Sequence, residues 1–377
     1  MNRIRLLDIL RGFAIIGTLG TNIWLFSALT NKQNNYFLGT NALWWDSFDS
    51  FLSTLFLFLV NGKLLGMLTI LFGVGLEIKY QQALRRKWMW PGIYIWGSVL
   101  LFLDGILHYI FVIEADVLMS YGVTAIIVSF LAKLHEDRLI KWFYGIGVFH
   151  LINVVLLTVT TALFPLGNLT DMISSSVYSA GSWVDQWIYR VENFWVLRAE
   201  AIFIIPQNIC LFIVGILLMR NKVFTVKTGI RTNIRRKLLT LGYVAVPLNL
   251  LSFLPYEFVF FPVRYIFAPV MTLFYIGLAA WLFEKWEHIK IFEYLESIGK
   301  MALSNYMLQN VVASIVFYGW GMGIGLQKLH AFAVIGIWFF ISIIMMIFSK
   351  LWLQYFKTGP IEWAWKGLTN FPRKIIR

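Results

Sequence analysis

The sequence predicts an all-α integral membrane protein with about ten transmembrane helices, and its composition and charge distribution support this class. Of the 377 residues, 59% are hydrophobic and 14% are charged, whereas soluble domains have roughly 45–50% apolar and about 25% charged residues. Ten crossings need about 200 apolar residues at about 20 per crossing, and 59% of 377 residues supplies about that number. The mean hydropathy of +0.72 also excludes a soluble, disordered or collagen-like chain. The one cysteine, Cys210, excludes an internal disulfide.

Apolar runs of about 17–25 residues define the predicted spans. They are 8–29, 48–78, 93–113, 115–134, 140–165, 197–219, 238–254, 259–283, 301–320 and 330–354. The run 48–78 is longer than one crossing and is interrupted by Asn61-Gly62-Lys63. One tilted helix and two half-helices are both open, and a single crossing is favoured because the distribution of basic residues then becomes consistent.

The basic residues orient these spans. With a cytoplasmic N-terminus, 24 of the 32 lysines and arginines lie in cytoplasmic segments and four lie in outer loops. The remaining four, Arg11, Lys63, Arg264 and Lys350, fall inside spans. By the positive-inside rule, we expect both termini in the cytoplasm and a multi-pass protein of the cell (inner/cytoplasmic) membrane. The net charge of +13 then reflects orientation and not nucleic-acid binding.

The domain organisation follows from the same pattern. We expect one polytopic transmembrane domain over 1–377, with an uncleaved first helix because Asp8 and Arg11 interrupt a signal-like apolar run. The outer loop 166–196 contains amphipathic sequence that favours an interfacial helix. Residues 355–377 are predicted to form a cytoplasmic basic tail.

The candidate site is centred on one histidine. Charged groups inside a membrane cost at least about 2.5–3.5 kcal/mol and need partners or a function. Asp104 and His108 lie one helical turn apart, and Glu114 and Asp116 follow at the outer turn. A carboxylate that holds one imidazole nitrogen leaves the other as a general base, which acyl transfer to a hydroxyl or amine requires. A histidine satisfied purely for packing is the alternative.

Other polar groups inside spans carry two interpretations each. Arg11 forms a local ion pair with Asp8 or binds a phosphate or carboxylate that enters from the cytoplasm. Lys63 lies deeper in its span, beside a glycine-containing break, so its ammonium group cannot easily extend to the membrane surface.

Three further residues lie nearer the outer side or on the ninth span. Arg264 lies close enough to the outer end to extend into the interface, while Asn305 and Gln309 either join helices or line a substrate path. The scattered histidines have no metal-ligand spacing, so we predict no metal.

Five segments resemble the YeiB-like membrane proteins, a family classed as domain of unknown function 418. They are LDILRGFAIIG at 7–17 with Asn22-Ile23, LFGVG at 71–75, GILH at 105–108 with ADVLMSYG at 115–122, IGKMALSNYMLQ at 298–309, and GPIEWAWK at 359–366. In the family, the last pattern ends the final helix. The family is related to transmembrane acyltransferases, so the resemblance implies an acyltransferase-like helical bundle with acyl-CoA or acetyl-CoA as donor and with a pore that the donor crosses.

One departure from the better-known acyltransferase branch decides the candidate base. That branch has an arginine, ten residues and then a histidine in its first helix, whereas here Arg11 is followed after ten residues by Asn22. His108, oriented by Asp116 or Asp104, therefore remains as the base. The donor would contact Arg11, Lys63 and Asn22, with the basic segments 79–87 and 220–237 at its phosphates. The substrate-binding candidates are Glu114, Arg264, Asn305 and Gln309.

Two functions follow. The first is a membrane-bound O- or N-acyltransferase that moves an acyl group from cytoplasmic acyl-CoA to a polar or sugar acceptor at the outer face. The alternative is a transporter or exporter of a small anionic or lipidic solute, with His108 and its carboxylates as a proton relay. The absence of clear internal symmetry weighs against the transporter.

Expected partners are membrane lipid and a small-molecule or glycan acceptor but no nucleic acid, and a homodimer stays open. An accessory protein without turnover is a third interpretation.

Overall fold

The computed structural model describes residues 4–31, 43–164, 175–224 and 229–375, and the regular structure of these residues is entirely helical. The elements of the first half are α1 (Arg5–Thr30), α2 (Phe48–Val60), α3 (Lys63–Arg85), α4 (Ile93–Phe111), α5 (Leu118–Leu131), α6 (Glu136–Leu163), α7 (Ser175–Ser179), α8 (Trp183–Glu192), α9 (Phe194–Leu197) and α10 (Ala201–Arg220). The elements of the second half are α11 (Gly229–Thr240), α12 (Gly242–Leu250), η4 (Leu251–Phe253), α13 (Glu257–Pro262), η5 (Val263–Phe267), α14 (Ala268–Lys285), α15 (Lys290–Lys300), α16 (Ala302–Phe317), η6 (Ile324–Leu326), α17 (Ala331–Tyr355) and α18 (Pro360–Ile375).

Seven helical segments among the described residues are long and apolar enough to cross a membrane. They are Arg5–Thr30, Phe48–Arg85, Ile93–Phe111, Glu136–Leu163, Phe194–Arg220, Glu257–Lys285 and Ala331–Tyr355. Helices α5 and α16, within the predicted spans 115–134 and 301–320, are apolar but shorter. The predicted span 238–254 corresponds to the short helix α12 followed by η4. The described residues therefore form a helical, multi-pass membrane protein, and the number of ten crossings stays a prediction.

The long apolar run 48–78 forms two helices. α2 ends at Val60, Asn61 is extended, and Gly62 has a φ of +75° before α3 begins at Lys63. A positive φ is rarely adopted by residues other than glycine, so this position ends one helix and starts another. One uninterrupted helix is therefore wrong for this run.

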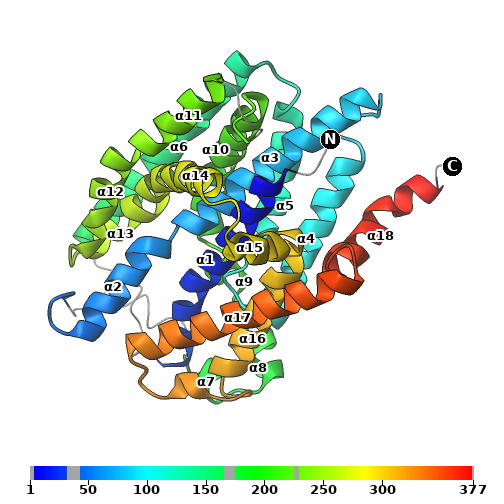
Figure 1. Cartoon of the computed structure of the whole chain (residues 1–377). Helices are drawn as coiled ribbons and strands as arrows, with labels where there is room; N and C mark the ends of the chain where they lie inside the picture. The colour runs from blue at the N-terminus through cyan, green and yellow to red at the C-terminus, as the bar shows by residue number, and fades with distance from the viewer. Residues whose placement is uncertain (1–3, 32–42, 165–174, 225–228, 376–377) are drawn as a thin grey trace.

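Helix α1 lies at the centre of the molecule, where it packs against α3, α15, α16 and α17 (Figure 1). Its contact with α15 depends on glycines. A Cβ atom on Gly299 would lie 1.8 Å from the carbonyl oxygen of Asp8, and one on Gly12 would lie 1.9 Å from that of Leu295. Small residues allow two helix backbones to approach this closely, as is common between membrane helices.

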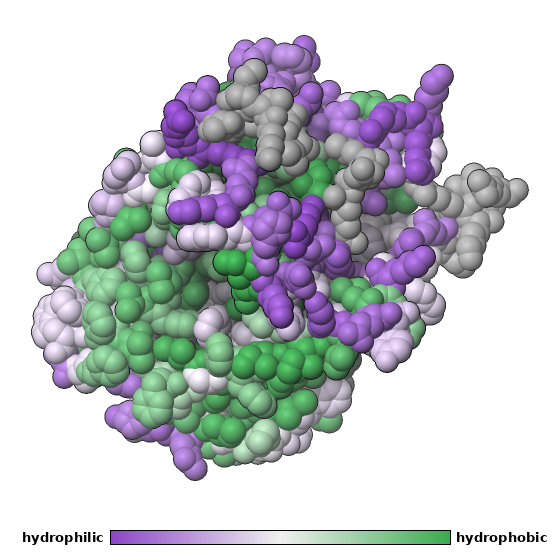
Figure 2. Space-filling view, in the orientation of Figure 1, coloured by the Kyte–Doolittle hydropathy of each residue, from purple (hydrophilic) through white to green (hydrophobic). Residues whose placement is uncertain are grey.

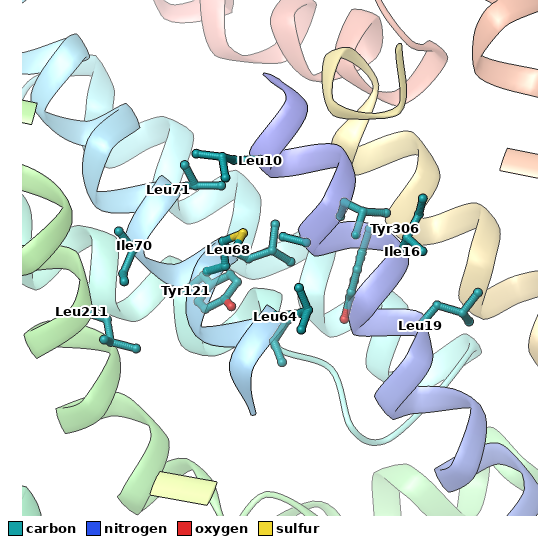
Figure 3. Packing of buried hydrophobic residues seen from close by; sticks show 14 of the residues in the cluster. Leu10, Ile16, Leu19, Leu64, Leu68, Ile70, Leu71, Tyr121, Leu211 and Tyr306 are labelled. Carbon is teal, nitrogen blue, oxygen red and sulfur yellow. The ribbon is translucent and has the colours of Figure 1, made fainter. Parts of the chain in front are cut away.

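The buried apolar cluster extends from α1 to its neighbours. Figure 3 shows Leu64 and Leu68 of α3 beside α1, with Tyr121 from α5 and Tyr306 from α16 in the same cluster. This packing brings together the helices that carry the polar residues described below.

Hydrophilic residues gather over α11, α15 and the C-terminal end of α3, while apolar residues cover much of the remaining face (Figure 2). Helices α7 and α8 lie toward the other end of α1 (Figure 1). The start of the predicted outer loop, 165–174, is outside the described residues. The predicted amphipathic segment of that loop forms α8, which begins with a capping box between Ser182 and Asp185.

The C-terminal segment is also helical. α17 ends at Tyr355, and the GPIEW motif starts a new helix, α18, instead of ending the last one. Pro360 occupies the first helical position, where the missing N–H has no cost.

We expect Gly299→Ala to lower the free energy of unfolding by about 1–3 kcal/mol, because the added methyl group overlaps backbone atoms of α1. Gly336→Ala is the matched control, because a Cβ atom there meets nothing within 4 Å. Unfolding of the purified variants in detergent measures both. Equal stability of the two variants would show that α1 and α15 do not pack this closely.

Candidate functional site

His108 and Asp116 form a buried pair at the end of α4. The imidazole Nδ1 lies 3.0 Å from Asp116 Oδ1, and both side chains are fully buried. The second carboxylate oxygen accepts the backbone N–H of Met119 at 3.0 Å, in the first turn of α5. A Cβ atom on Gly105 would lie 2.4 Å from the Met119 nitrogen and 2.8 Å from Asp116 Oδ2. Glycine at the first position of the GILH motif therefore allows the carboxylate to reach the histidine.

Two asparagines continue this pair into a chain of four side chains. Asn310 Nδ2 lies 3.3 Å from His108 Nε2, and Asn22 Nδ2 donates to Asn310 Oδ1 at 3.1 Å. Because an amide nitrogen only donates, Nε2 is the acceptor and Nδ1 carries the proton toward Asp116. The chain joins α1, α4, the start of α5 and α16, and it leaves an unprotonated imidazole nitrogen beside two amides.

Two neighbours of His108 complete its surroundings. The ring of Tyr306 lies 5.2 Å from the imidazole centroid. Asp104, one turn before His108, has a buried Oδ2 with no hydrogen-bond partner among the described residues. Of the two carboxylates considered from sequence, the one bonded to the imidazole is thus Asp116.

Arg198 holds the turn that carries Asp116. Its guanidinium donates to the carbonyl oxygen of Asp116 at 2.6 Å, to that of Glu114 at 3.3 Å and to Ser120 Oγ at 3.3 Å. From the sequence, Arg198 is interpreted only as one of the four basic residues in outer loops. Its position just before α10 could be related to Asp116 only by the fold.

Glu114 belongs to a second buried cluster that covers the end of α4. Its carboxylate accepts the hydroxyl of Tyr178 at 2.7 Å and lies 3.6 Å from Arg190 Nε. Burial, together with this carboxylate, raises the pKa of Tyr178 well above its usual range, so that the hydroxyl remains a donor. Arg190 also donates to the carbonyl oxygen of Ile110 at 2.9 Å, and its own carbonyl oxygen accepts from Tyr109 at 2.6 Å. Helix α8 is thereby fixed over the last turn of α4.

The GPIEW motif caps the helix that carries Asn310. Glu362 Oε1 accepts the backbone N–H groups of Leu303 at 2.7 Å and Ser304 at 3.2 Å, and Oε2 accepts the Ser304 hydroxyl. A carboxylate at a helix N-terminus also interacts favourably with the helix dipole. Helix α18 contacts α4 as well, where Trp96 Nε1 donates to the carbonyl oxygen of Leu368 at 3.0 Å. One C-terminal helix therefore joins α4 and α16, which carry His108 and Asn310.

Lys63 and Arg264 lie in a different cluster. Arg264 donates to Asn61 Oδ1 at 2.5 Å and lies 3.4 Å from Glu200 Oε1. Lys63 Nζ lies 5.6 Å from the ring centroid of Phe58. These groups meet where α2, α3, α10 and η5 converge.

The other predicted residues also have separate surroundings. Arg11 binds Asp8 at 3.0 Å near the start of α1. Asn305 donates to Ser349 Oγ at 2.8 Å and so joins α16 to α17. Gln309 is fully buried, and neither of its amide atoms has a hydrogen-bond partner among the described residues.

The structure thus separates the set that the sequence grouped around one cavity. Of the predicted donor-binding residues, Asn22 joins the His108 chain. Arg11 pairs with Asp8, and Lys63 lies near Phe58 in the separate cluster described above. Asn310, which completes the chain, was missed as a site residue. The sequence feature that could have identified Asn310 is its position. It follows Gln309 directly and lies four residues after Tyr306, on the same helix face as that tyrosine.

The helical bundle, its apolar segments and its buried histidine–carboxylate pair define a polytopic membrane protein with a polar centre. Residues 218–372 match a family model described as "Protein of unknown function (DUF418)". The chain is 25% identical to the uncharacterized protein YeiB of Escherichia coli (strain K12), over 98% of this chain and 97% of the relative. It is 22% identical to the uncharacterized protein YxaH of Bacillus subtilis (strain 168), over 97% of this chain and 94% of the relative.

The resemblance to the YeiB-like DUF418 family that the sequence predicts is therefore confirmed by the match of residues 218–372 and by these two relatives. No solved structure matches the chain. The family model covers Asn310 and Glu362 but begins after Asn22, His108 and Asp116.

We expect Glu362→Ala to lower the free energy of unfolding by about 1–3 kcal/mol, because two backbone N–H groups of α16 lose their acceptor. Glu293→Ala is the control, because Glu293 is half-exposed and pairs with Lys350 on the surface. Such pairs contribute about 0–1 kcal/mol. Chemical unfolding of both variants in detergent measures the difference, and equal losses would contradict the capping role.

Proposed function

We propose that the protein is a membrane acyltransferase in which His108 is the general base. The observation that carries the proposal is the hydrogen-bonded chain from Asp116 through His108 and Asn310 to Asn22. It presents an unprotonated imidazole nitrogen and two amide groups side by side. These are the groups that acyl transfer from a thioester to a hydroxyl or amine requires.

In the proposed reaction, His108 Nε2 takes the proton of the acceptor hydroxyl or amine as the acceptor atom bonds to the thioester carbonyl carbon. Amide N–H groups of Asn310 and Asn22 donate to the oxyanion that develops on the carbonyl oxygen. When the carbon–sulfur bond breaks, protonated His108 returns the proton to the leaving sulfur. Asp116 stabilises the imidazolium, and the Met119 N–H keeps the carboxylate in place.

The burial of the pair supports this use. His108 is 2% exposed, and the cluster of Glu114, Tyr178 and Arg190 covers the end of α4. A buried base is protected from water, which would otherwise hydrolyse an activated acyl group. The 3.3 Å contact between Asn310 and His108 is at the long end of hydrogen bonds, so that an acceptor group can replace it at little cost.

We infer further that acyl-CoA is the donor and that it enters at the end of the bundle where the basic residues gather. Figure 2 shows hydrophilic surface there, over the C-terminal end of α3 and over α11, and these segments carry exposed cations. They are Arg86, Lys87, Arg236 and Lys237. They suit the phosphates of such a donor better than Arg11, which bonds to Asp8. We propose that this end is cytoplasmic, in agreement with the positive-inside rule.

The acyl acceptor would then meet His108 from the opposite end, where α7 and α8 lie. We propose a polar or sugar acceptor at the outer face of the cell membrane. A second candidate function is transport of a small anionic or lipidic solute. The break between α2 and α3 favours it, because discontinuous helices bind anionic substrates at their half-helix N-termini in several transporters.

We expect His108→Ala to lower thioester cleavage by the purified protein by about 10²-fold or more, because general base catalysis contributes about 10²–10⁴-fold. The measurement is thiol release from acetyl-CoA. His135→Ala is the matched control, because the His135 side chain is 78% exposed. Cleavage that survives His108→Ala in a folded variant would exclude the proposed base.

We expect Asn310→Ala to lower the same rate by about 10²-fold, since it removes one oxyanion donor. Asn305→Ala is a comparison on the same helix, whose amide bonds to Ser349 and not to His108. Anion flux from loaded vesicles without any acetyl-CoA consumption would favour transport over acyl transfer.

A further inference from the structure

Lys63 is a buried cation that donates no hydrogen bond to any described residue. It is the first residue of α3 and is 1% exposed. Its position is fixed through the backbone, because the Thr272 hydroxyl donates to the Lys63 carbonyl oxygen at 2.7 Å. Nζ itself lies near the ring of Phe58. A charge inside a membrane bundle without a carboxylate is a functional-site hypothesis by default.

The surroundings of Lys63 add positive charge. Arg264 donates to Asn61, two residues before Lys63, and so brings a second basic group to this cluster. Glu200 lies 3.4 Å from the Arg264 guanidinium. Helix α3 also begins here without a side-chain cap. Its first N–H groups and the positive end of its dipole therefore add to the two cations. Two basic side chains and a helix N-terminus thus lie in one cluster.

The backbone places these groups together. η5 is a π-helix, and π-helical turns often occur at functional sites. A Cβ atom on Gly62 would lie 3.1 Å from the Arg264 carbonyl oxygen and 3.0 Å from Ala268 Cβ. The break before α3 therefore rests directly on the turn that carries Arg264.

The exposed fraction of the side chains in this cluster rises from Lys63 to Arg264 to Glu200. The side chain of Glu200 is 47% exposed and that of Arg264 is 15% exposed, whereas Lys63 is buried. Ile202, next to the exposed end, is 64% exposed. The more exposed side of the cluster, at Glu200, is therefore close in the chain to an exposed apolar residue.

We propose that Lys63, Arg264 and the N-terminus of α3 bind the acidic head group, a carboxylate or a phosphate, of an amphiphile. The head group would accept from Lys63 Nζ and the first N–H groups of α3, and the apolar part would extend toward the exposed Ile202. The site does not use His108, and so it applies to acyl transfer and to transport alike.

The test uses the full-length protein in a neutral detergent, with decyl phosphate, decanoate or inorganic phosphate as probes. We expect at least one amphiphile to raise the unfolding temperature saturably, because a ligand stabilises the folded state that binds it. Lys63→Met should weaken the apparent affinity at least tenfold. Without a probe, this variant should unfold at the same or a higher temperature, because it removes an unpaired buried charge.

Three further variants make the test specific. Lys63→Gln removes the charge but keeps a polar group, and it replaces Lys63→Met if that variant does not fold. Lys350→Met removes a lysine of α17 that pairs with Glu293, and it should bind the probes like the original protein. His108→Ala should also bind the probes normally. A result that contradicts the role of His108 as a base can therefore be distinguished from a result that contradicts this anion site.

The choice of probe identifies the source of the anion. Stabilisation by decyl phosphate alone indicates a phospholipid head group and stabilisation by decanoate alone indicates a fatty acid, provided that each effect is lost in the Lys63 variants. Stabilisation by inorganic phosphate but by neither amphiphile would contradict the proposed amphiphile. Equal binding by the Lys63 variants, or no saturable effect of any probe, would overturn the proposal.

Discussion

Lipid offers neither donors nor acceptors, so a polar group inside this bundle is stabilised by a partner within the protein, and leaving it without one is costly. Helix N-termini are the most affected, since their first N–H groups have no intrahelical acceptor. In three helices a carboxylate from a preceding turn or a distant segment is the acceptor. Asp116 accepts from α5, Glu362 from α16, and Asp49 from Ala331 at the start of α17 at 2.5 Å. These three carboxylates therefore stabilise the helical bundle, whether or not they also belong to a functional site.

Two of these carboxylates also position the candidate site. Asp116 uses one oxygen for the start of α5 and the other for His108, so that the orientation of the imidazole follows from the way α5 begins. Glu362 fixes the start of α16, about two helical turns before Asn310. The short distance between His108 and Asn310 thus depends not only on the bond from His108 to Asp116 but also on contacts that include neither residue, those of Asp116 with Met119 and of Glu362 with Leu303 and Ser304.

Much of the architecture could be predicted from the sequence, because apolar run length and charge asymmetry are local properties. The interruption at 61–63 and the amphipathic helix α8 were visible in the same way. The composition of the site was harder to predict. Gln309 and Asn310 are adjacent, and only the packing of α16 decides that Asn310 faces α4. Lys63 and His108 are both buried and polar, yet they lie in different clusters because α3 starts beside η5. Glu362 stands in a recognisable motif, but its partner is the start of another helix.

The capping of α16 by α18 has a consequence for the order in which the molecule can be completed. Glu362 follows Ser304 by 58 residues, and the whole of α17 separates the two helices. During synthesis, α16 leaves the ribosome without its cap and acquires it only after α17 and the start of α18 have been made. The first turn of α16 must therefore stay hydrated or unformed until that moment, and the polar centre of the bundle is assembled from its most distant parts at a late step.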